Sequence, residues 1–157
     1  MKVSQSKKPK KKAGSKGKKS ENLYKKWLEN QGYLCHKAAP GSLFNTGSFV
    51  MCRSNDIFGC IDILAIKPTP PAATIAAQLT TQDGRSARKA KLAAIKHWPE
   101  SWSIVLVTHE VIKEAKKKAQ HRWKCETLLD ENRWSDIFYI DFQMSALTPA
   151  QAKPSGA

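Results

Sequence analysis

The sequence predicts a single domain of the α/β class, in which strands and helices are interleaved around one core. Three observations lead to this prediction. The chain has 157 residues, enough for one hydrophobic core but too few for two substantial ones. A short helical pattern precedes a group of apolar, strand-like runs. A second helical pattern separates these runs from another apolar strand, so the order is helix, strand, strand, strand, helix, strand.

The first helix is predicted from Ser20, a suitable N-cap residue, to Gly32, a suitable C′ residue. Its apolar residues recur at helical spacing and form a core-facing stripe: Leu23, Tyr24, Trp27 and Leu28. Glu21 lies on the same side as this stripe. Taken alone, Glu21 is explained by the favourable interaction of an acidic residue with the helix dipole.

Strands are predicted at Tyr33–Ala38 and, more briefly, at Phe49–Arg53. The central feature follows them. It is a β-hairpin of two Ile-containing runs, Cys60–Ile66 and Ala73–Leu79, joined by a proline-rich turn. Asp62 lies inside the first run, where burial of its charge requires compensation, for instance by a metal ion. In the second run, the alternation of side chains places Gln78 and Thr80 on one face.

The remaining elements follow a turn at Gln82-Asp83-Gly84. A helix rich in good helix formers is predicted over Arg85–His97, ending before Pro99. Residues 111–119 fit a helix or a loop equally well. The later strands are predicted at Trp102–Thr108 in the core, at Arg122–Thr127 as an edge strand, and at Ile137–Phe142.

The net charge of +14 is concentrated at the N-terminus, because residues 1–19 contain nine lysines and no acidic residue. We expect this segment to be disordered, since it cannot bury apolar surface. Docking on the phosphate backbone of nucleic acid is its favoured role. A solubilising tail and a nuclear-localisation-like address are the alternatives. Residues 20–144 would form the domain, and residues 145–157, rich in Pro, Ala and Ser, a flexible C-terminal tail.

No apolar run approaches the ~20 residues that span a bilayer, and the N-terminus lacks the apolar core of a secretion signal. We therefore expect a cytoplasmic protein without a membrane partner, nucleoid-associated or, if phage-encoded, in the host cytoplasm. The four cysteines contain no C-x-x-C pair. Buried free thiols are the favoured interpretation, and a zinc site is the minor alternative.

The predicted order of elements, and the residues that it positions, resemble the PD-(D/E)XK nuclease superfamily. Its restriction-endonuclease-like fold is shared with Holliday-junction resolvases and VRR-NUC domains. The resemblance covers Ser20 to Thr108 and implies a mixed β-sheet flanked by helices. In this superfamily an Asp enters the second core strand and a (Glu/Gln)-x-Lys triplet lies on the third. A Glu on the first helix often completes the metal site. The matching residues here are Asp62, Gln78 and Glu21.

The resemblance implies a metal-dependent DNA endonuclease, in particular one that resolves branched DNA or Holliday junctions, with Mg²⁺ or Mn²⁺ as its cofactor. Asp62 would be the principal metal ligand, assisted by Gln78 and Glu21. Thr80 stands where the superfamily has a lysine, so a cation would have to come from the following helix. Arg88 and Lys91 are the best candidates and Lys89 is the next. The catalytic set is then Glu21, Asp62, Gln78, Thr80 and Lys91.

The predicted partner is nucleic acid, with DNA favoured over RNA. Five cationic side chains are predicted to contact it: Arg53, Arg85, Arg88, Lys89 and Lys96. Homodimerisation is common in the resembled fold and is the protein partnership that the resemblance suggests. Because Thr80 cannot supply a charge, a nucleic-acid-binding module that has lost cleavage is a second hypothesis. A basic RNA-binding protein unrelated to nucleases is the third.

Overall fold

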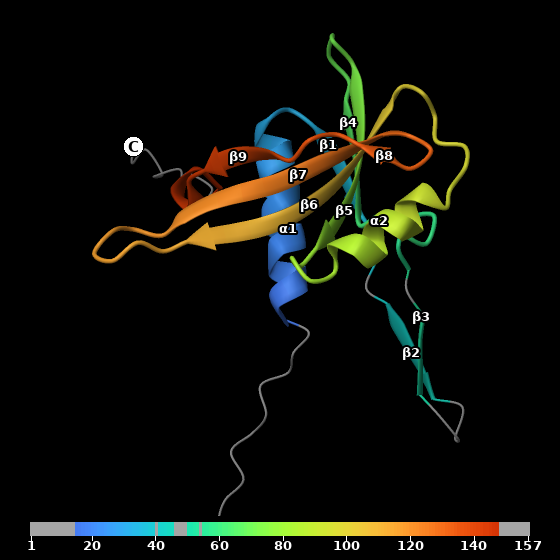
Figure 1. Ribbon diagram of the computed structural model, residues 1–157, viewed down its shortest axis with the longest axis horizontal. Coiled ribbons are helices and arrows are strands. Elements are labelled where there is room, and N and C mark those ends of the chain that lie inside the picture. Colours follow the sequence, from blue (N-terminus) through green and yellow to red (C-terminus); the bar gives the residue numbers. More distant parts are fainter. Residues whose placement is uncertain (1–14, 40, 46–49, 54, 148–157) are drawn as a thin grey trace, which may run out of the picture.

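The computed structural model describes residues 15–39, 41–45, 50–53 and 55–147. Within these ranges a mixed seven-stranded sheet forms the centre of the molecule (Figure 1). Its strand order is β1-β4-β5-β6-β7, and both β8 and β9 pair with β7. Strands β5 and β6 are parallel, and the other described pairs are antiparallel. The strands are β1 Leu34–Lys37, β4 Ile63–Lys67, β5 Ala73–Thr80, β6 Trp102–Ile112, β7 Gln120–Asp130, β8 Arg133–Trp134 and β9 Phe138–Phe142. The predicted α/β class is confirmed.

Helix α1, Ser15–Asn30, ends as the sequence predicts. Gly32 adopts a positive φ of 88°, its N–H donates to Glu29 O, and the N–H of Tyr33 donates to Leu28 O. This pair of hydrogen bonds is the Schellman motif that a C′ glycine permits. The helix begins earlier than predicted, because Ser20 lies inside it and is not the N-cap. Residues 15–19, expected in the disordered tail, are helical, since lysine is a good helix former and a packed helix extends at little cost. Residues 1–14 of that tail lie outside the described residues.

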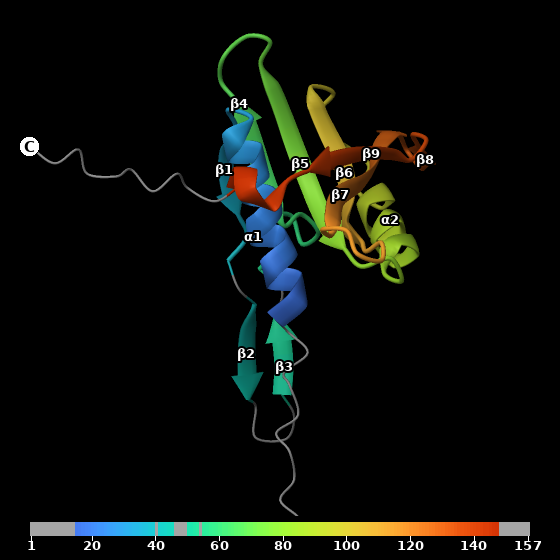
Figure 2. The same cartoon turned by 90° about the vertical axis from the view of Figure 1, so that its left-hand side faces the viewer.

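The hairpin of β4 and β5 is confirmed, and α1 and α2 lie on opposite sides of β5 (Figure 2). On the α1 side, Ala77 and Leu79 of β5 pack with Tyr24 and Leu28 of the helix. On the α2 side, Ala76 packs with other apolar residues: Cys60, Ile61, Leu92, Ile104 and Leu106. Helix α2 spans Arg85–Ala93 and therefore ends four residues before the predicted end at His97. We call the two surfaces of the sheet the α1 face and the α2 face.

Strand β7 contradicts the prediction of an edge strand. It pairs with β6 on one side and with β8 and β9 on the other. Trp123 and Cys125 are buried on its α1 face. The charged residues that alternate with them, Lys124 and Glu126, misled the sequence interpretation because their charges are paired within the fold. The undecided segment 111–119 contains the end of β6 and the turn before β7, with no helix.

Three elements were not predicted, and one of them is the short strand β8 given above. Strand β2, Ser42–Asn45, pairs with β3, Val50–Arg53, in a separate two-stranded sheet that projects away from the rest of the molecule (Figures 1 and 2). A 3-10 helix, η1, follows at Met144–Leu147 and contacts α1. Leu147 is buried there, so residues 145–147 belong to the domain rather than to the expected tail. Residues 148–157 lie outside the described residues. No helix in the described ranges has the length and apolarity needed to cross a membrane.

Candidate metal and nucleic-acid site

The buried polar residues of the described chain all lie on the α2 side of the sheet. They are Gln78, Arg85, Thr108 and Glu126. Gln78 follows Ala76 at a strand period of two, and Thr108 follows Leu106 in the same way, so both share the face of the α2 core. Buried polar groups are costly unless they are hydrogen-bonded or paired. Their concentration on one face therefore marks this region as the candidate site.

The structure brings Asp62 and Gln78 into direct contact, as the sequence predicts. Asp62 immediately precedes β4, and its N–H continues the ladder by donating to Ala77 O at 3.0 Å. Its side-chain Oδ2 accepts hydrogen bonds from Leu79 N at 2.7 Å and from Gln78 Nε2 at 2.5 Å. Both bonds end on Oδ2, so Oδ1 takes neither of them. The hairpin register thus positions a carboxylate against the end of the neighbouring strand.

The carboxyl group of Asp62 has its pKa raised to about 6, mainly by burial. The charges of Glu21 and Asp56 raise this pKa further, whereas the hydrogen bond from Leu79 and the charge of Arg88 lower it. The charges of two further acidic groups therefore act on Asp62 at this end of the sheet. Such clustering raises the affinity of the site for a cation, because a positive charge relieves the repulsion among the carboxylates.

Glu21 is close enough to Asp62 for its charge to act there, but its direct contact is with Lys37 of β1. Lys37 Nζ lies 2.9 Å from Glu21 Oε2 and donates to Asn22 Oδ1 at 2.6 Å. The structure thus places the charge of Glu21 within electrostatic range of Asp62 and pairs Glu21 with a lysine. Its role as a metal ligand stays a prediction.

Gln78 provides the test of whether the site suits a metal. Its side chain is 1% exposed, and Nε2 donates to both Asp62 Oδ2 and Leu79 O. Its amide oxygen Oε1 is buried with no hydrogen-bond partner in the described chain. An unpartnered buried oxygen beside a carboxylate fits a hard, oxygen-seeking divalent cation such as Mg²⁺ or Mn²⁺. The described residues contain no group of three His, Cys, Asp or Glu suited to a metal, so a site at Asp62 would depend on this amide oxygen.

Thr80 ends β5 and pairs in register with Thr108 of β6. Its Oγ1 lies against the turn before α2, only 2.5 Å from where a Cβ atom on Gly84 would stand. The close packing of this turn requires a residue without a side chain at position 84. Thr80 therefore contributes a hydroxyl at the strand end, in the place where the resembled superfamily has a charge.

The two cations proposed to replace that charge are placed differently. Lys91 Nζ lies 3.9 Å from Asp56 Oδ2 and is half exposed. Arg88 is partly buried, and its charge lowers the pKa of Asp62. Both cations act on the thiol of Cys60, whose pKa is raised by burial and lowered by these charges. The charge of Arg88 acts on Asp62 and that of Lys91 is paired with Asp56, which favours Arg88 as the cation that serves the Asp62 site.

Arg85 requires a correction, because it was expected to contact nucleic acid at the surface. It is only 7% exposed. Its Nε and Nη2 donate to Glu126 Oε2, and its Nη1 donates to Thr108 Oγ1 at 2.5 Å. Lys89 pairs with the other carboxylate oxygen of Glu126. Burial tends to raise the pKa of Glu126, but the hydrogen bonds and charges of Arg85 and Lys89 outweigh it and hold this pKa below its ordinary value.

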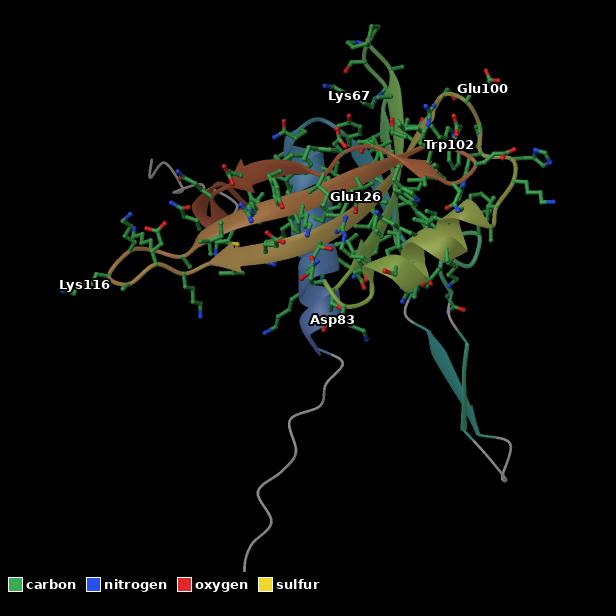
Figure 3. All side chains as sticks on the ribbon, in the orientation of Figure 1. Lys67, Asp83, Glu100, Trp102, Lys116 and Glu126 are labelled. Carbon is green, nitrogen blue, oxygen red and sulfur yellow. The ribbon has the colours of Figure 1, made fainter. Side chains whose placement is uncertain are left out.

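Glu126, labelled in Figure 3, was not among the site residues predicted from the sequence. The available signal was its position in β7, one residue after the buried Cys125 and therefore on the opposite face. Its partners, Lys89 and Arg85 of α2, lie 37 and 41 residues earlier in the chain. No local sequence pattern indicates a contact over that separation. The network holds α2 against the sheet, and Leu106 of β6 separates Glu126 from Gln78 in the strand register.

The other residues predicted to contact nucleic acid occupy different environments. Lys96 is exposed beside a depression lined by residues of α2 and of the β7–β8 turn. Lys89 lies 5.3 Å from the ring centre of Trp134 in addition to its ion pair. Arg53 ends β3, and its side chain lies outside the described part of the chain. These residues stay predictions as nucleic-acid contacts.

Comparison of the chain with protein-family models, with curated proteins and with solved structures finds no match. The resemblance to the PD-(D/E)XK superfamily therefore stays a prediction from the motif residues.

Proposed function

We propose that the protein is a metal-dependent phosphodiesterase acting on nucleic acid. More narrowly, we propose a DNA endonuclease of the PD-(D/E)XK type, acting on branched DNA. The observation that supports this most strongly is the contact between Asp62 and Gln78 at the end of the hairpin. There a carboxyl group with a raised pKa accepts a hydrogen bond from the Gln78 amide, whose buried oxygen has no partner in the described chain.

A bound Mg²⁺ or Mn²⁺ would supply charge neutralisation at the phosphate and a water of lowered pKa. Asp62 would hold the cation through its carboxylate, Gln78 through Oε1, and Glu21 from α1. Arg88 would bind a phosphate oxygen in place of the lysine that is absent at position 80. Because the pKa of Asp62 is about 6, its ionised form predominates only above that pH, so activity should rise with pH through this range.

A second candidate is a module on the same fold that binds nucleic acid without cleaving it. Two observations favour it. Thr80 supplies no charge, and Lys91 lies near Asp56 rather than at Asp62. Under this alternative the basic surface of α2 would still hold the phosphate backbone, with the salt dependence that counterion release imposes.

Cleavage assays on supercoiled plasmid and on a synthetic four-way DNA junction separate these candidates. The wild-type chain and Asp62→Asn are compared in Mg²⁺, Mn²⁺ and EDTA. Glu114→Gln is the matched control, because it removes an exposed acid whose ion pair is with Lys117 in the β6–β7 turn. We expect metal-dependent cutting by the wild type and the control, and none above the EDTA background by Asp62→Asn.

Salt-sensitive binding with no cutting in any metal would contradict the nuclease and favour the binding module. Thr80→Lys then becomes the informative variant, because it restores the charge that the superfamily places there. Cutting that is equal in the wild type and in Asp62→Asn would contradict both the site and the proposed mechanism.

A further inference from the structure

An exposed aromatic side chain stands beside the candidate site, in a turn that carries one of its acids. Phe58 is 65% exposed and belongs to the turn Asp56–Gly59, closed by a hydrogen bond from Gly59 N to Asp56 O at 2.9 Å. Its φ is 52°, in the left-handed region that non-glycine residues rarely adopt. A large apolar residue at an exposed, conformationally unfavourable position is not explained by core packing.

Phe58 is part of a cluster of three aromatic rings. Its ring centre lies 6.3 Å from that of Trp98 and 6.1 Å from that of Trp102, and the two indoles are 6.5 Å apart. The tryptophans are partly buried against the α2 core, and Trp98 Nε1 donates to Leu92 O at 3.2 Å. Trp102 begins β6 (Figure 3). The cluster therefore combines two partly buried rings with one exposed ring.

Two cations of helix α2, Lys91 and Arg88, lie near this cluster. Asp56, in the same turn as Phe58, lies 3.9 Å from Lys91. The charges of Lys91 and Arg88 both act on Cys60, which directly follows the turn, and the charge of Asp56 acts on Asp62. Of the four Lys or Arg residues in helix α2, Arg85 and Lys89 are paired with Glu126, which leaves Arg88 and Lys91 as the cations that can serve this surface. An aromatic ring beside cations that can hold phosphate is the combination by which proteins bind single-stranded nucleic acid.

We propose that Phe58 is a stacking platform for an unpaired base, so that the protein's substrate contains unstacked nucleotides beside the scissile phosphate. This inference rests on the proposed function for its position next to the cleavage site. The binding itself needs no cleavage. Branched, flapped or single-stranded DNA offers such bases, whereas an uninterrupted duplex does not.

The test measures binding in EDTA, where cleavage plays no part. Fluorescence anisotropy compares three probes of equal length: oligo-dT, an oligonucleotide with an abasic tract, and an uninterrupted duplex. The abasic probe keeps the phosphates and removes the bases. We expect the wild type to prefer oligo-dT over the abasic probe by roughly five- to hundredfold, the usual range for stacking on an aromatic side chain.

Phe58→Asn is the informative variant, because asparagine tolerates a positive φ and removes the ring. Leu34→Asn is the control, since it removes a side chain of similar exposure, 68%, from β1. We expect Phe58→Asn to bind oligo-dT and the abasic probe equally and Leu34→Asn to keep the wild-type preference. Phe58→Asn should also match or exceed the wild type in Tm, because its backbone is less strained.

Three results would overturn the proposal. One is a wild type that binds the abasic probe as tightly as oligo-dT. Another is an unchanged preference in Phe58→Asn. The third is a dimer, seen by sedimentation velocity, that Phe58→Asn dissociates while oligo-dT binding is unaffected, because Phe58 would then contact a second copy of the chain. Absence of cleavage by a protein that still prefers oligo-dT would count against the proposed nuclease alone.

Discussion

The two faces of the central sheet are built from the same strands but differ sharply in chemistry. The α1 face is an apolar core, in which Tyr24 and Leu28 of the helix pack on residues such as Trp123 and Val107. The α2 face begins as an apolar core but ends in buried polar groups, including Gln78 and the ion pair between Arg85 and Glu126. Apolar packing dominates the first face. The second carries polar groups that packing does not require, which is why we assign function to it.

The largest loss of stability should come from breaking the buried ion pair between Arg85 and Glu126 on the α2 face. Glu126→Gln leaves the guanidinium of Arg85 without its charge partner in an interior position, and we expect a loss of about 3–5 kcal/mol in the free energy of unfolding. Urea unfolding followed by circular dichroism measures it. Arg85→Met combined with Glu126→Leu should cost less than the single change, because no unpaired charge remains. A loss below ~1 kcal/mol in Glu126→Gln would show that the pair does not hold α2 in place.

A smaller change in the free energy of unfolding, with the opposite sign, is expected when Asp62 is replaced. Its pKa is about 6 in the folded chain, against 3.8 as the ordinary value, so the folded state binds a proton more tightly than the unfolded state does. Stability is therefore lost as pH rises from about 4 to about 6, and the penalty persists above this range. Asp62→Asn should unfold with about 1–3 kcal/mol more stability than the wild type at pH 7.5, and the difference should vanish near pH 4.

The difference between the two unfolding curves is the informative quantity, because other groups titrate equally in both proteins. Asp136→Asn, which changes an exposed acid before β9, serves as the control. A wild-type chain that is more stable than Asp62→Asn at pH 7.5 would mean that the carboxylate is a structural ligand of Leu79 and Gln78 rather than a group kept for function.

The sequence predicted those parts of the molecule whose signals are local. The hairpin follows from two apolar runs around a proline-rich turn, and its register brings Asp62 to Gln78. The end of α1 follows from Gly32. The parts that escaped prediction depend on contacts between distant segments. Strand β7 is internal because three other strands pair with it, and Glu126 is buried because α2 supplies two cations. The alternating charges of β7 describe an edge strand equally well when those partners are unknown.

The start of α1 shows a different limit. Nine lysines in residues 1–19 indicate disorder by charge, yet lysine also favours helix once a packed helix exists to extend. Residues 15–19 follow the second tendency. The separate sheet of β2 and β3 was half predicted, because β3 falls within the predicted strand Phe49–Arg53, whereas no strand was predicted over Ser42–Asn45.

Direct titration of metal tests the central assignment, that the polar end of the α2 face holds a hard divalent cation. Calorimetric titration of Mn²⁺ at pH 7.5 compares the wild type with Asp62→Asn and Glu114→Gln, each alone and with a cleavage-resistant phosphorothioate junction. We predict one saturable site in the wild type and in Glu114→Gln, and its loss in Asp62→Asn. Equal binding by all three proteins, or no saturable binding by the wild type even with the junction present, would contradict the account.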